Sequence, residues 1–354
     1  MHLLLTEPGD EPFLLAEWRS GAAGGGRSEM LGGGLVRVEA ELRRESWPVL
    51  AFARQLLPLA EPVAGASIRD WSERLFTAVS GRLVEGQPWR LHLATHYGER
   101  GAGENRVRLI GEALGELLRK KRRHLMRGLE EGAAPFGERT SLVQALLTGP
   151  DAGFLSVAPA PLPWQWRHSV WPFVKGEVPV ASDKAAPSRA FAKLVEAELR
   201  LGRRIAAGET CVDLGACPGS WSYVAVNRGA RVVAVDRSPL REDLMRDPRV
   251  RFEQGDAFKF VPEAPVDWLL CDVIAAPERS VGLVLDWLRG RRCRRLVVTI
   301  KFKGHDEYAK LEPLKRALPE FCDDFFLTRL CANKNEVCAG GVVRGGDCRL
   351  ATGP

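Results

Sequence analysis

Hydrophobic and polar positions follow different rhythms in the two halves of the chain. After residue 187, short apolar runs rich in β-branched residues recur at regular intervals, which predicts strands at 210–214, 232–236, 250–254, 268–272, 296–301, 325–330 and 337–343. The segments between them predict helices at 188–205, with Ser188 as N-cap, and at 220–228, 240–246, 278–289 and 306–317. Strands separated by helices indicate a parallel, doubly wound α/β sheet that binds ligands at the carboxyl ends of its strands.

The first half has a less regular pattern. Up to about residue 60, short apolar runs are interrupted by glycine-rich stretches at 21–26 and 32–34, which predicts small strands and one helix around turns. Between 61 and 150, apolar residues spaced three and four apart predict helices at 68–76 and 109–129. An alternating stretch at 89–95 predicts a strand between these helices. We therefore expect an α+β region before the sheet.

Residues 150–187 are rich in proline and tryptophan, which predicts a connector, because proline restricts the backbone and interrupts helices. Its tryptophans, among them Trp166 and Trp171, suit stacking on unpaired bases or packing at a domain interface, and we favour packing. The domains that we expect are an amino-terminal subdomain at 1–60, a second domain at 61–165, a linker at 166–186 and an α/β domain at 187–354.

Composition narrows the class of protein. A chain of 354 residues is long enough for two or three buried cores. No apolar run approaches the ~20 residues that cross a bilayer, and the amino terminus lacks the basic start of a signal peptide. We therefore expect a cytoplasmic protein with no membrane partner. The eight cysteines all lie in the second half and form no Cys-x-x-Cys pair, which argues against a zinc site or a disulfide framework, so no metal is expected.

The net charge of +6 is mild evidence for a polyanionic partner. The densest positive run lies at 117–127, on the second helix expected in the first half; it contains Arg119, Lys120, Lys121, Arg122 and Arg123. Such a run can follow a phosphate backbone. A charge run is more often a solvated helix face, however, and on this run alone we favour the solvated face.

The stretch 210–221 combines a strand, a glycine turn and the start of a helix. Gly215, Pro218 and Gly219 require a sharp turn after the apolar run 211–214. Unpaired backbone N–H groups at such a turn suit a carboxylate or phosphate group of a cofactor. The two glycines are four residues apart, which differs from the Gly-x-Gly-x-x-Gly spacing of dinucleotide sites and disfavours NAD.

Four aspartates lie near the ends of the first four strands of this half: Asp213, Asp236, Asp256 and Asp272. Asp236 follows the glycine turn by about 20 residues, the place where a carboxylate binds a ribose diol. Asp256 suits a purine amino group. A single aspartate of this kind is usually a turn residue, but four in register with one glycine turn predict a site for a nucleotide-like cofactor.

Three further charged residues fall near the same edge of the expected sheet. Lys193 lies on the helix that leads into the sheet, Lys301 ends the fifth strand and Glu336 begins the last one. Any one of them alone would be a solvated charge. Together with Asp272 they predict a lysine–aspartate–lysine–glutamate group around one point.

These motifs resemble the FtsJ-like Rossmann-fold methyltransferases, which methylate ribose 2′-hydroxyls of RNA. The resemblance rests on Pro187-Ser-Arg with Lys193, Val212-Asp-Leu-Gly-Ala-Cys-Pro-Gly with Trp221, Cys271-Asp272, Ile300-Lys301 and Glu336-Val337. It is dense over 185–344 and thin before 180. It implies a Rossmann-like sheet, mostly parallel with an antiparallel last strand, preceded by a ferredoxin-like subdomain and a THUMP-like RNA-binding domain.

The resemblance also implies the cofactor, S-adenosyl-L-methionine, and the substrate, RNA. Within the family it is closest to a bacterial subgroup that methylates a cytidine of large-subunit (23S) rRNA. The cofactor contacts that we expect are Ser188, Gly215, Cys217, Pro218, Gly219, Ser220, Trp221, Asp236, Asp256 and Asp272. At position 220 the subgroup usually has glycine, so we expect Ser220 to crowd the methionine end of the cofactor slightly.

The catalytic group that the resemblance implies is Lys193, Asp272, Lys301 and Glu336, with Lys301 as proton acceptor. A lysine accepts a proton only when it is neutral, a form that burial and a neighbouring cation favour and that neighbouring carboxylates disfavour, so the sequence leaves this balance open. Other readings remain: the same reaction on a tRNA or an mRNA cap, an RNA-binding or ribosome-assembly protein without turnover, and, least favoured, a dehydrogenase.

Overall fold

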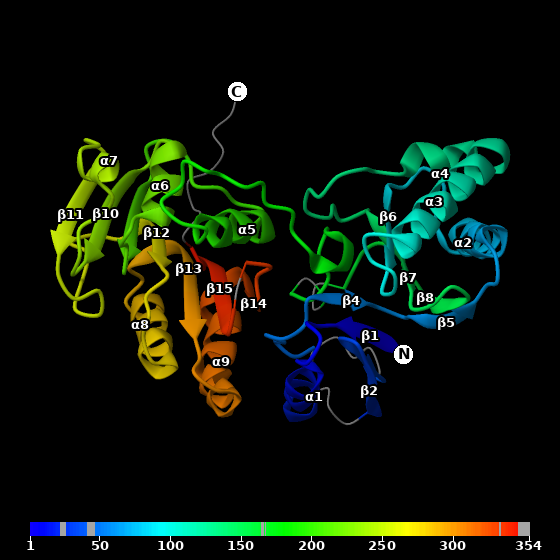
Figure 1. Cartoon of the computed structure of the whole chain (residues 1–354), viewed down its shortest axis with the longest axis horizontal. Helices are drawn as coiled ribbons and strands as arrows, with labels where there is room; N and C mark the ends of the chain where they lie inside the picture. Colours follow the sequence, from blue (N-terminus) through cyan, green and yellow to red (C-terminus); the bar gives the residue numbers. More distant parts are fainter. Residues whose placement is uncertain (22–25, 41–46, 164–165, 167, 333, 346–354) are drawn as a thin grey trace. The chain divides into compact units, whose positions relative to one another are not determined.

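A computed structural model describes the chain except for residues 22–25, 41–46, 164–165, 167, 333 and 346–354. The chain separates into two compact units, Met1–Glu177 and Val178–Pro354 (Figure 1). The division between them falls inside the segment predicted as a linker. Among the described residues, no helix has both the length and the apolar character needed to cross a membrane.

The first sheet of the amino-terminal unit has the strand order β2-β3-β1-β4. Its elements are β1 (His2–Leu5), α1 (Glu11–Ser20), β2 (Ser28–Gly32), β3 (Leu35–Val38) and β4 (Gln55–Leu57). All of its pairs are antiparallel. The carboxylate of Glu11 accepts hydrogen bonds from the backbone of Gly9 and Gly34, which ties the first turn of α1 to the start of β3. In the described part of residues 1–60, the predicted small strands and helix are confirmed.

The second sheet of this unit has the order β5-β8-β7-β6. Its elements are β5 (Glu61–Ala64), α2 (Ile68–Arg82), β6 (Trp89–Thr95), α3 (Ala102–Lys121), α4 (Arg123–Gly128), β7 (Ser141–Leu147) and β8 (Ala152–Ala158). Only β6 and β7 pair in parallel. The helix predicted at 109–129 is two helices, because the backbone at Arg122 (φ −147°) leaves the helical region. The connector predicted from residue 150 begins too early, since Leu155 and Val157 of β8 are buried in the core.

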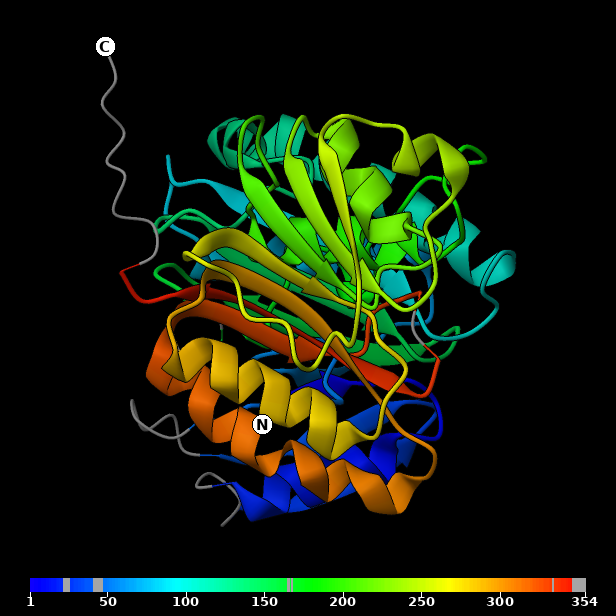
Figure 2. The ribbon, with the colours of Figure 1, turned by 90° about the vertical axis from the view of Figure 1, so that its left-hand side faces the viewer.

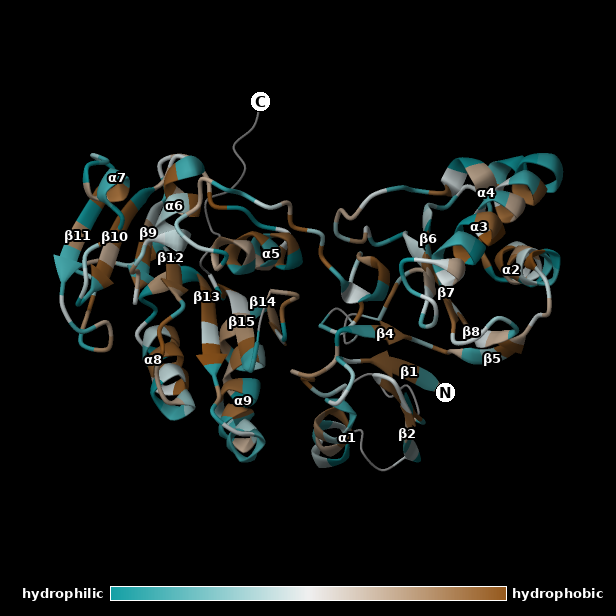
Figure 3. Ribbon diagram, viewed as in Figure 1, coloured by the Kyte–Doolittle hydropathy of each residue, from teal (hydrophilic) through white to brown (hydrophobic). Residues whose placement is uncertain are grey.

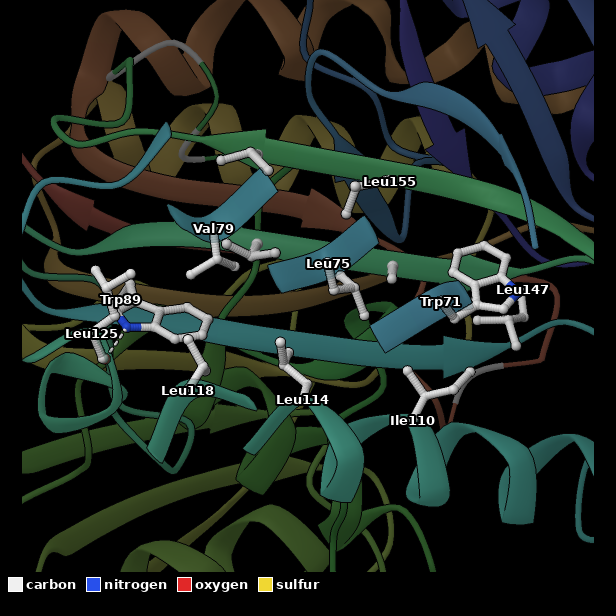
Figure 4. Close-up of a cluster of buried hydrophobic side chains, with 13 residues drawn as sticks. Trp71, Leu75, Val79, Trp89, Ile110, Leu114, Leu118, Leu125, Leu147 and Leu155 are labelled. Carbon is white, nitrogen blue, oxygen red and sulfur yellow. Dashed lines mark hydrogen bonds between the residues drawn. The ribbon is translucent and has the colours of Figure 1, made fainter. Parts of the chain in front are cut away.

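The helices α2 and α3 pack on the second sheet through a core that contains two tryptophans (Figure 4). Trp71 of α2 and Trp89 of β6 are fully buried with Leu75, Leu114 and their neighbours. The indole Nε1 of Trp89 donates to the carbonyl of Leu125 at 2.7 Å, which holds α4 beside β6. In Figure 3 the helices and strands carry both hydrophobic residues (brown) and hydrophilic residues (teal).

A pair of buried glutamines joins the two sheets of the amino-terminal unit. Gln55 of β4 donates to the side chain of Gln144 of β7 at 3.1 Å and to the carbonyls of Trp171 and Phe173. Gln144 donates back to the carbonyl of Leu56 at 2.8 Å. Trp171 also donates its backbone N–H to Gln55. The proline- and tryptophan-rich segment is therefore built into this unit, and Trp166 and Trp171 are buried within it.

The carboxy-terminal unit contains a seven-stranded sheet of order β11-β10-β9-β12-β13-β15-β14. The strands are β9 (Thr210–Leu214), β10 (Arg231–Asp236), β11 (Val250–Gln254), β12 (Val266–Cys271), β13 (Cys293–Lys301), β14 (Cys322–Thr328) and β15 (Glu336–Val343). β15 runs antiparallel to both of its neighbours, β13 and β14, and the other pairs of this sheet are parallel. The predicted α/β class, the seven strands and the antiparallel last strand are confirmed.

Helices cover both faces of this sheet. They are α5 (Phe191–Leu201), α6 (Ser220–Asn227), α7 (Glu242–Met245), α8 (Pro277–Arg289) and α9 (Glu312–Phe321). Figure 2 shows α8 (gold) and α9 (orange) side by side on one face, and in Figure 1 α5 and α6 lie on the other. The helix predicted at 306–317 is wrong in its first part, because η3 (His305–Leu311) is a 3-10 helix that precedes α9.

The N-cap prediction for Ser188 is wrong. The helix α5 begins at Phe191 with Ala190 as its N-cap. Ser188 lies two residues earlier, where its hydroxyl accepts a hydrogen bond from the backbone N–H of Ala190 at 3.2 Å. The serine caps a local turn before the helix and not the helix itself.

Candidate active site

Four charged side chains predicted to form one group meet at the carboxyl edge of the sheet. Lys193 of α5 lies 3.1 Å from the Asp272 carboxylate and 2.6 Å from the Glu336 carboxylate. Lys301, the last residue of β13, lies 3.0 Å from Asp272 Oδ1 and also donates to the Asp272 backbone carbonyl at 2.6 Å. Asp272, just after β12, is therefore shared by both lysines.

The sheet places these residues by its register. Lys301 and Glu336 are directly paired across β13 and β15. Lys193 reaches them because α5 packs against β15. The side chains of Lys193 and Glu336 are 10% and 7% exposed, whereas that of Lys301 is 22% exposed. Of the two lysines, Lys301 is thus the one more open to an incoming substrate.

The surroundings of Lys193 favour its charged form. Burial lowers the pKa of Lys193, but the carboxylates of Asp272 and Glu336 outweigh it, so the pKa lies above its ordinary value. Lys193 consequently stays positively charged at neutral pH. Its charge makes it less costly to hold the partly buried Asp272 carboxylate and the buried Glu336 carboxylate there.

One member of the site was missed at the sequence level. Thr299 is fully buried, and its hydroxyl donates to Asp272 Oδ1 at 2.6 Å. It lies two residues before Lys301 on β13, so the two side chains share a face of the strand. The sequence does contain a signal for it, a polar residue within the apolar run 296–300 that lies two positions before Lys301. Thr299 fixes one oxygen of the carboxylate that both lysines share.

The glycine turn between β9 and α6 lies beside this group along the same edge of the sheet. Gly215 has a φ of +74°, and a Cβ there would lie 2.8 Å from the side chain of Val273. Gly219 has a φ of +103°, and a Cβ there would lie 2.3 Å from Leu244. Only glycine satisfies both constraints. The Cys217–Pro218 peptide bond between them is cis.

Comparison with known proteins places this arrangement in a family. Residues 186–348 match the family described as FtsJ-like methyltransferase. The Ribosomal RNA large subunit methyltransferase M of Alkalilimnicola ehrlichii is 34% identical over 313 residues, which cover 84% of this chain and 82% of the relative. The chain belongs to the FtsJ-like methyltransferase family.

Other relatives match over a shorter length. The proteins of the same name from Thauera aminoaromatica and Stutzerimonas stutzeri are 37% and 38% identical, over 46% and 44% of this chain. These matches span 44% and 45% of the relatives, so the chain spans about half of their length. A solved structure titled a possible methylase from Clostridium difficile 630 covers 97% of each chain with 12% identity and a TM-score of 0.34.

FtsJ-like methyltransferases use S-adenosyl-L-methionine, and the turn of this FtsJ-like chain fits such a cofactor. Among the described residues, no acceptor is found for the backbone N–H groups of Ser220 and Trp221 at the start of α6. Free amides at a helix N-terminus suit the carboxylate of a methionine group. The residues present therefore fit the cofactor, and within the described part of the chain no cluster of metal ligands accompanies them.

The predicted contacts at Ser188, Ser220 and Trp221 have other partners in this structure. The hydroxyls of Ser188 and Ser220 hydrogen-bond each other at 2.7 Å, so the Ser220 side chain is directed to the turn that precedes α5. The indole of Trp221 is buried and donates to the carbonyl of Ala190 at 2.9 Å. Trp221 thus ties α6 to the residue before α5.

The acidic residues predicted to hold the adenosine part lie farther along the edge. One oxygen of Asp236 accepts from the backbone of Cys217 at 3.0 Å and the other from Ser238 at 2.9 Å. Asp256 accepts from the backbone of Phe258, and this bond with the nearby Arg237 keeps the pKa of Asp256 below its ordinary value. Both carboxylates retain lone pairs that suit a ribose hydroxyl or a purine amino group.

Asp213 differs from the other three strand-end aspartates. It is buried, and its carboxyl accepts a hydrogen bond from the Ser222 hydroxyl at 2.7 Å. Burial raises the pKa of Asp213 to about 7, and the Ser222 hydrogen bonds offset only part of that rise. Asp213 therefore supports the turn from inside the sheet and does not face the ligand side.

Proposed function

We propose that this chain is an S-adenosyl-L-methionine-dependent 2′-O-ribose methyltransferase of RNA and that its substrate is a cytidine of 23S rRNA. The observation that carries the proposal is the shared carboxylate of Asp272, which holds Lys193 and Lys301 beside Glu336 and next to the glycine turn. The family membership and the names of the relatives support the reaction and the kind of RNA.

The geometry assigns different tasks to the two lysines. S-adenosyl-L-methionine supplies an electrophilic methyl group when it is bound. Lys193 stays charged, because its pKa is raised, and therefore does not accept a proton at neutral pH. Lys301 is the more exposed lysine and, in its neutral form, takes the proton of the ribose 2′-hydroxyl. Asp272 and Glu336 hold the two amino groups in place, so that positioning supplies part of the rate.

For the amino-terminal unit we propose RNA binding. The two four-stranded sheets, each with its own helices, are the candidates for the ferredoxin-like and THUMP-like parts that the sequence resemblance implies. The end of α3 and the start of α4 carry exposed Arg119, Lys120, Lys121, Arg122 and Arg123, which we call the basic surface. Within the described residues, no salt bridge neutralises these five side chains. That surface is available to a phosphate backbone.

Two alternatives keep parts of this picture. The same site would methylate a tRNA or an mRNA cap if the RNA partner differed, and an RNA-binding assembly protein would retain the fold without turnover. The intact four-residue group favours an active enzyme. Family membership disfavours the dehydrogenase reading. A cytoplasmic location, with no membrane or metal partner, stays a prediction of the sequence.

The direct test is to incubate the chain with labelled S-adenosyl-L-methionine and unmodified 23S rRNA and to map ribose methylation. We expect one cytidine to be labelled, and Lys301→Ala to lower kcat at least 100-fold, because the proton acceptor is lost. Cofactor affinity, measured by calorimetry, should change little. Lys303→Ala is the matched control, since Lys303 is exposed and lies two residues away.

Three results would contradict these assignments. Full activity of Lys301→Ala would show that Lys301 is not the base. Labelling of tRNA or capped RNA alone would change the substrate. Cofactor binding by the wild-type chain without methyl transfer to any RNA would favour the assembly protein.

A further inference from the structure

The catalytic strand pair ends abruptly at the site. Lys301 is the last residue of β13, and its cross-strand partner Glu336 is the first residue of β15. Strand ends fray unless other bonds fasten them. Whatever fastens the next residue pair, Phe302 and Asn335, therefore also fixes the separation of the Lys301 and Glu336 backbones.

Asn335 fastens this end with both its backbone and its side chain. The backbone N–H of Phe302 donates to the Asn335 carbonyl at 3.0 Å. The side-chain Nδ2 of Asn335 donates to the Phe302 carbonyl at 3.0 Å. In a regular antiparallel pair a backbone N–H makes this second bond. The asparagine amide takes its place, one residue beyond the catalytic pair.

The other end of the amide is also held. Asn335 Oδ1 accepts from the hydroxyl of Tyr308 at 2.7 Å and from Arg329 Nη2 at 3.2 Å. Arg329 donates to the Tyr308 hydroxyl as well, at 2.8 Å. Donors on one side and an acceptor on the other fix which way the amide points. Tyr308 is itself buried and packs edge-on against the Phe302 ring, with ring centroids 4.9 Å apart.

We propose that Asn335 is a positioning residue for methyl transfer: its side-chain amide closes the β13–β15 ladder and so sets the distance between Lys301 and Glu336. The inference rests on the proposed function, because it assigns a task within that same site. Asn335 is a positioning and not a catalytic residue, since its side-chain hydrogen bonds go to Phe302, Tyr308 and Arg329. A displacement of about 1 Å at a reacting group can cost about 100-fold in rate, so a loosened ladder should slow the chemical step.

The test compares Asn335→Asp, which keeps the size of the side chain, with Tyr308→Phe, which keeps the ring packing. In Asn335→Asp an oxygen replaces the Nδ2 donor and faces the Phe302 carbonyl. We expect kcat to fall at least tenfold in Asn335→Asp and about threefold in Tyr308→Phe. The KM for 23S rRNA and the Kd for S-adenosyl-L-methionine should stay within threefold. Asn227→Ala, at an exposed site on α6, is the control.

Rates are expressed per cofactor-binding molecule, counted by calorimetric titration, so that misfolded protein does not lower kcat. Hydrogen exchange of the Phe302 amide gives a readout that is independent of activity, and we expect it to be at least tenfold faster in Asn335→Asp. A wild-type kcat and wild-type exchange in Asn335→Asp would overturn the proposal. If that variant does not fold, an unchanged kcat in Tyr308→Phe would overturn it. Failure of the proposed function would show differently, as absence of methyl transfer by the wild-type chain.

Discussion

The two units of this chain use polar side chains for different tasks. In the carboxy-terminal unit, the Asp272 carboxylate joins Lys193 and Lys301 at one edge of the sheet. In the amino-terminal unit, the buried neutral amides of Gln55 and Gln144 join the two sheets, and the cations of the basic surface are exposed. Buried, paired ions are costly and suit a reaction site, whereas exposed cations suit a polyanion. The contrast separates chemistry from binding along one chain.

The largest expected effect comes from removing the shared carboxylate. Asp272→Asn should lower kcat at least 1000-fold, because it removes the charge that holds both lysines and leaves Lys193 with Glu336 alone. RNA affinity, measured by filter binding, should stay within threefold, since the basic surface is untouched. Asp286→Asn, at an exposed position on α8, is the control. A large loss of RNA affinity in Asp272→Asn would break the separation of the two tasks.

An intermediate effect is expected from substitutions on the basic surface of the amino-terminal unit. Replacing all five residues of the basic surface by glutamine should weaken RNA binding 10- to 100-fold at about 0.1 M salt. The dependence of log K on log salt should flatten by up to about 0.9 for each lost phosphate contact. At saturating RNA, kcat should be unchanged. Equal affinity and an equal salt slope would return this helix end to an ordinary solvated face.

The smallest effect concerns stability and pH. Burial, with a smaller contribution from Arg90, lowers the pKa of His92 to about 4, so its unfolded form binds more protons between about pH 6.5 and 4. The contribution of His92 therefore lowers stability as the pH falls through that window. Asp213, with its pKa raised to about 7, acts in the opposite direction: its stabilising contribution is complete below about pH 4 and is lost as the pH rises to 7.

Denaturant unfolding of wild type, His92→Gln and Asp213→Asn at several pH values measures both contributions. Asp213→Asn should gain stability relative to wild type as the pH rises from 5 to 7, by up to about 1.4 kcal/mol per pH unit. His92→Gln should gain relative to wild type as the pH falls from 6 to 4.5. Parallel curves for all three proteins would show that neither group titrates with folding.

The sheet of the carboxy-terminal unit was predictable because its strands are short, apolar runs bounded by turns. For the strands at 210–214 and 250–254, the predicted first and last residues are the same as in the structure. In the amino-terminal unit, β7 was not predicted, because all seven of its residues are buried and its sequence has no alternation. A continuous apolar run of this kind does not distinguish a strand from a helix.

The residues of the site also divide into those that the sequence predicts and those that it does not. Lys193, Asp272, Lys301 and Glu336 are charged residues at predicted strand or helix ends, and the structure brings them together. Their specific roles stay predictions. Asn335 was missed because its amide becomes informative only once β13 and β15 are in register. Hydrogen bonds between segments distant in sequence are set by tertiary packing, which a single sequence does not display.

The glutamine pair has a consequence for how this protein can be divided. The side chain of Gln55, on β4, hydrogen-bonds β7 and the segment 171–173. Removing any of these three segments would therefore expose a buried amide. Fragments cut near residue 60 or residue 165 would each lose part of that network. We therefore expect that a chimaeric protein must contain all of the amino-terminal 177 residues, and not a part of them, for this unit to fold.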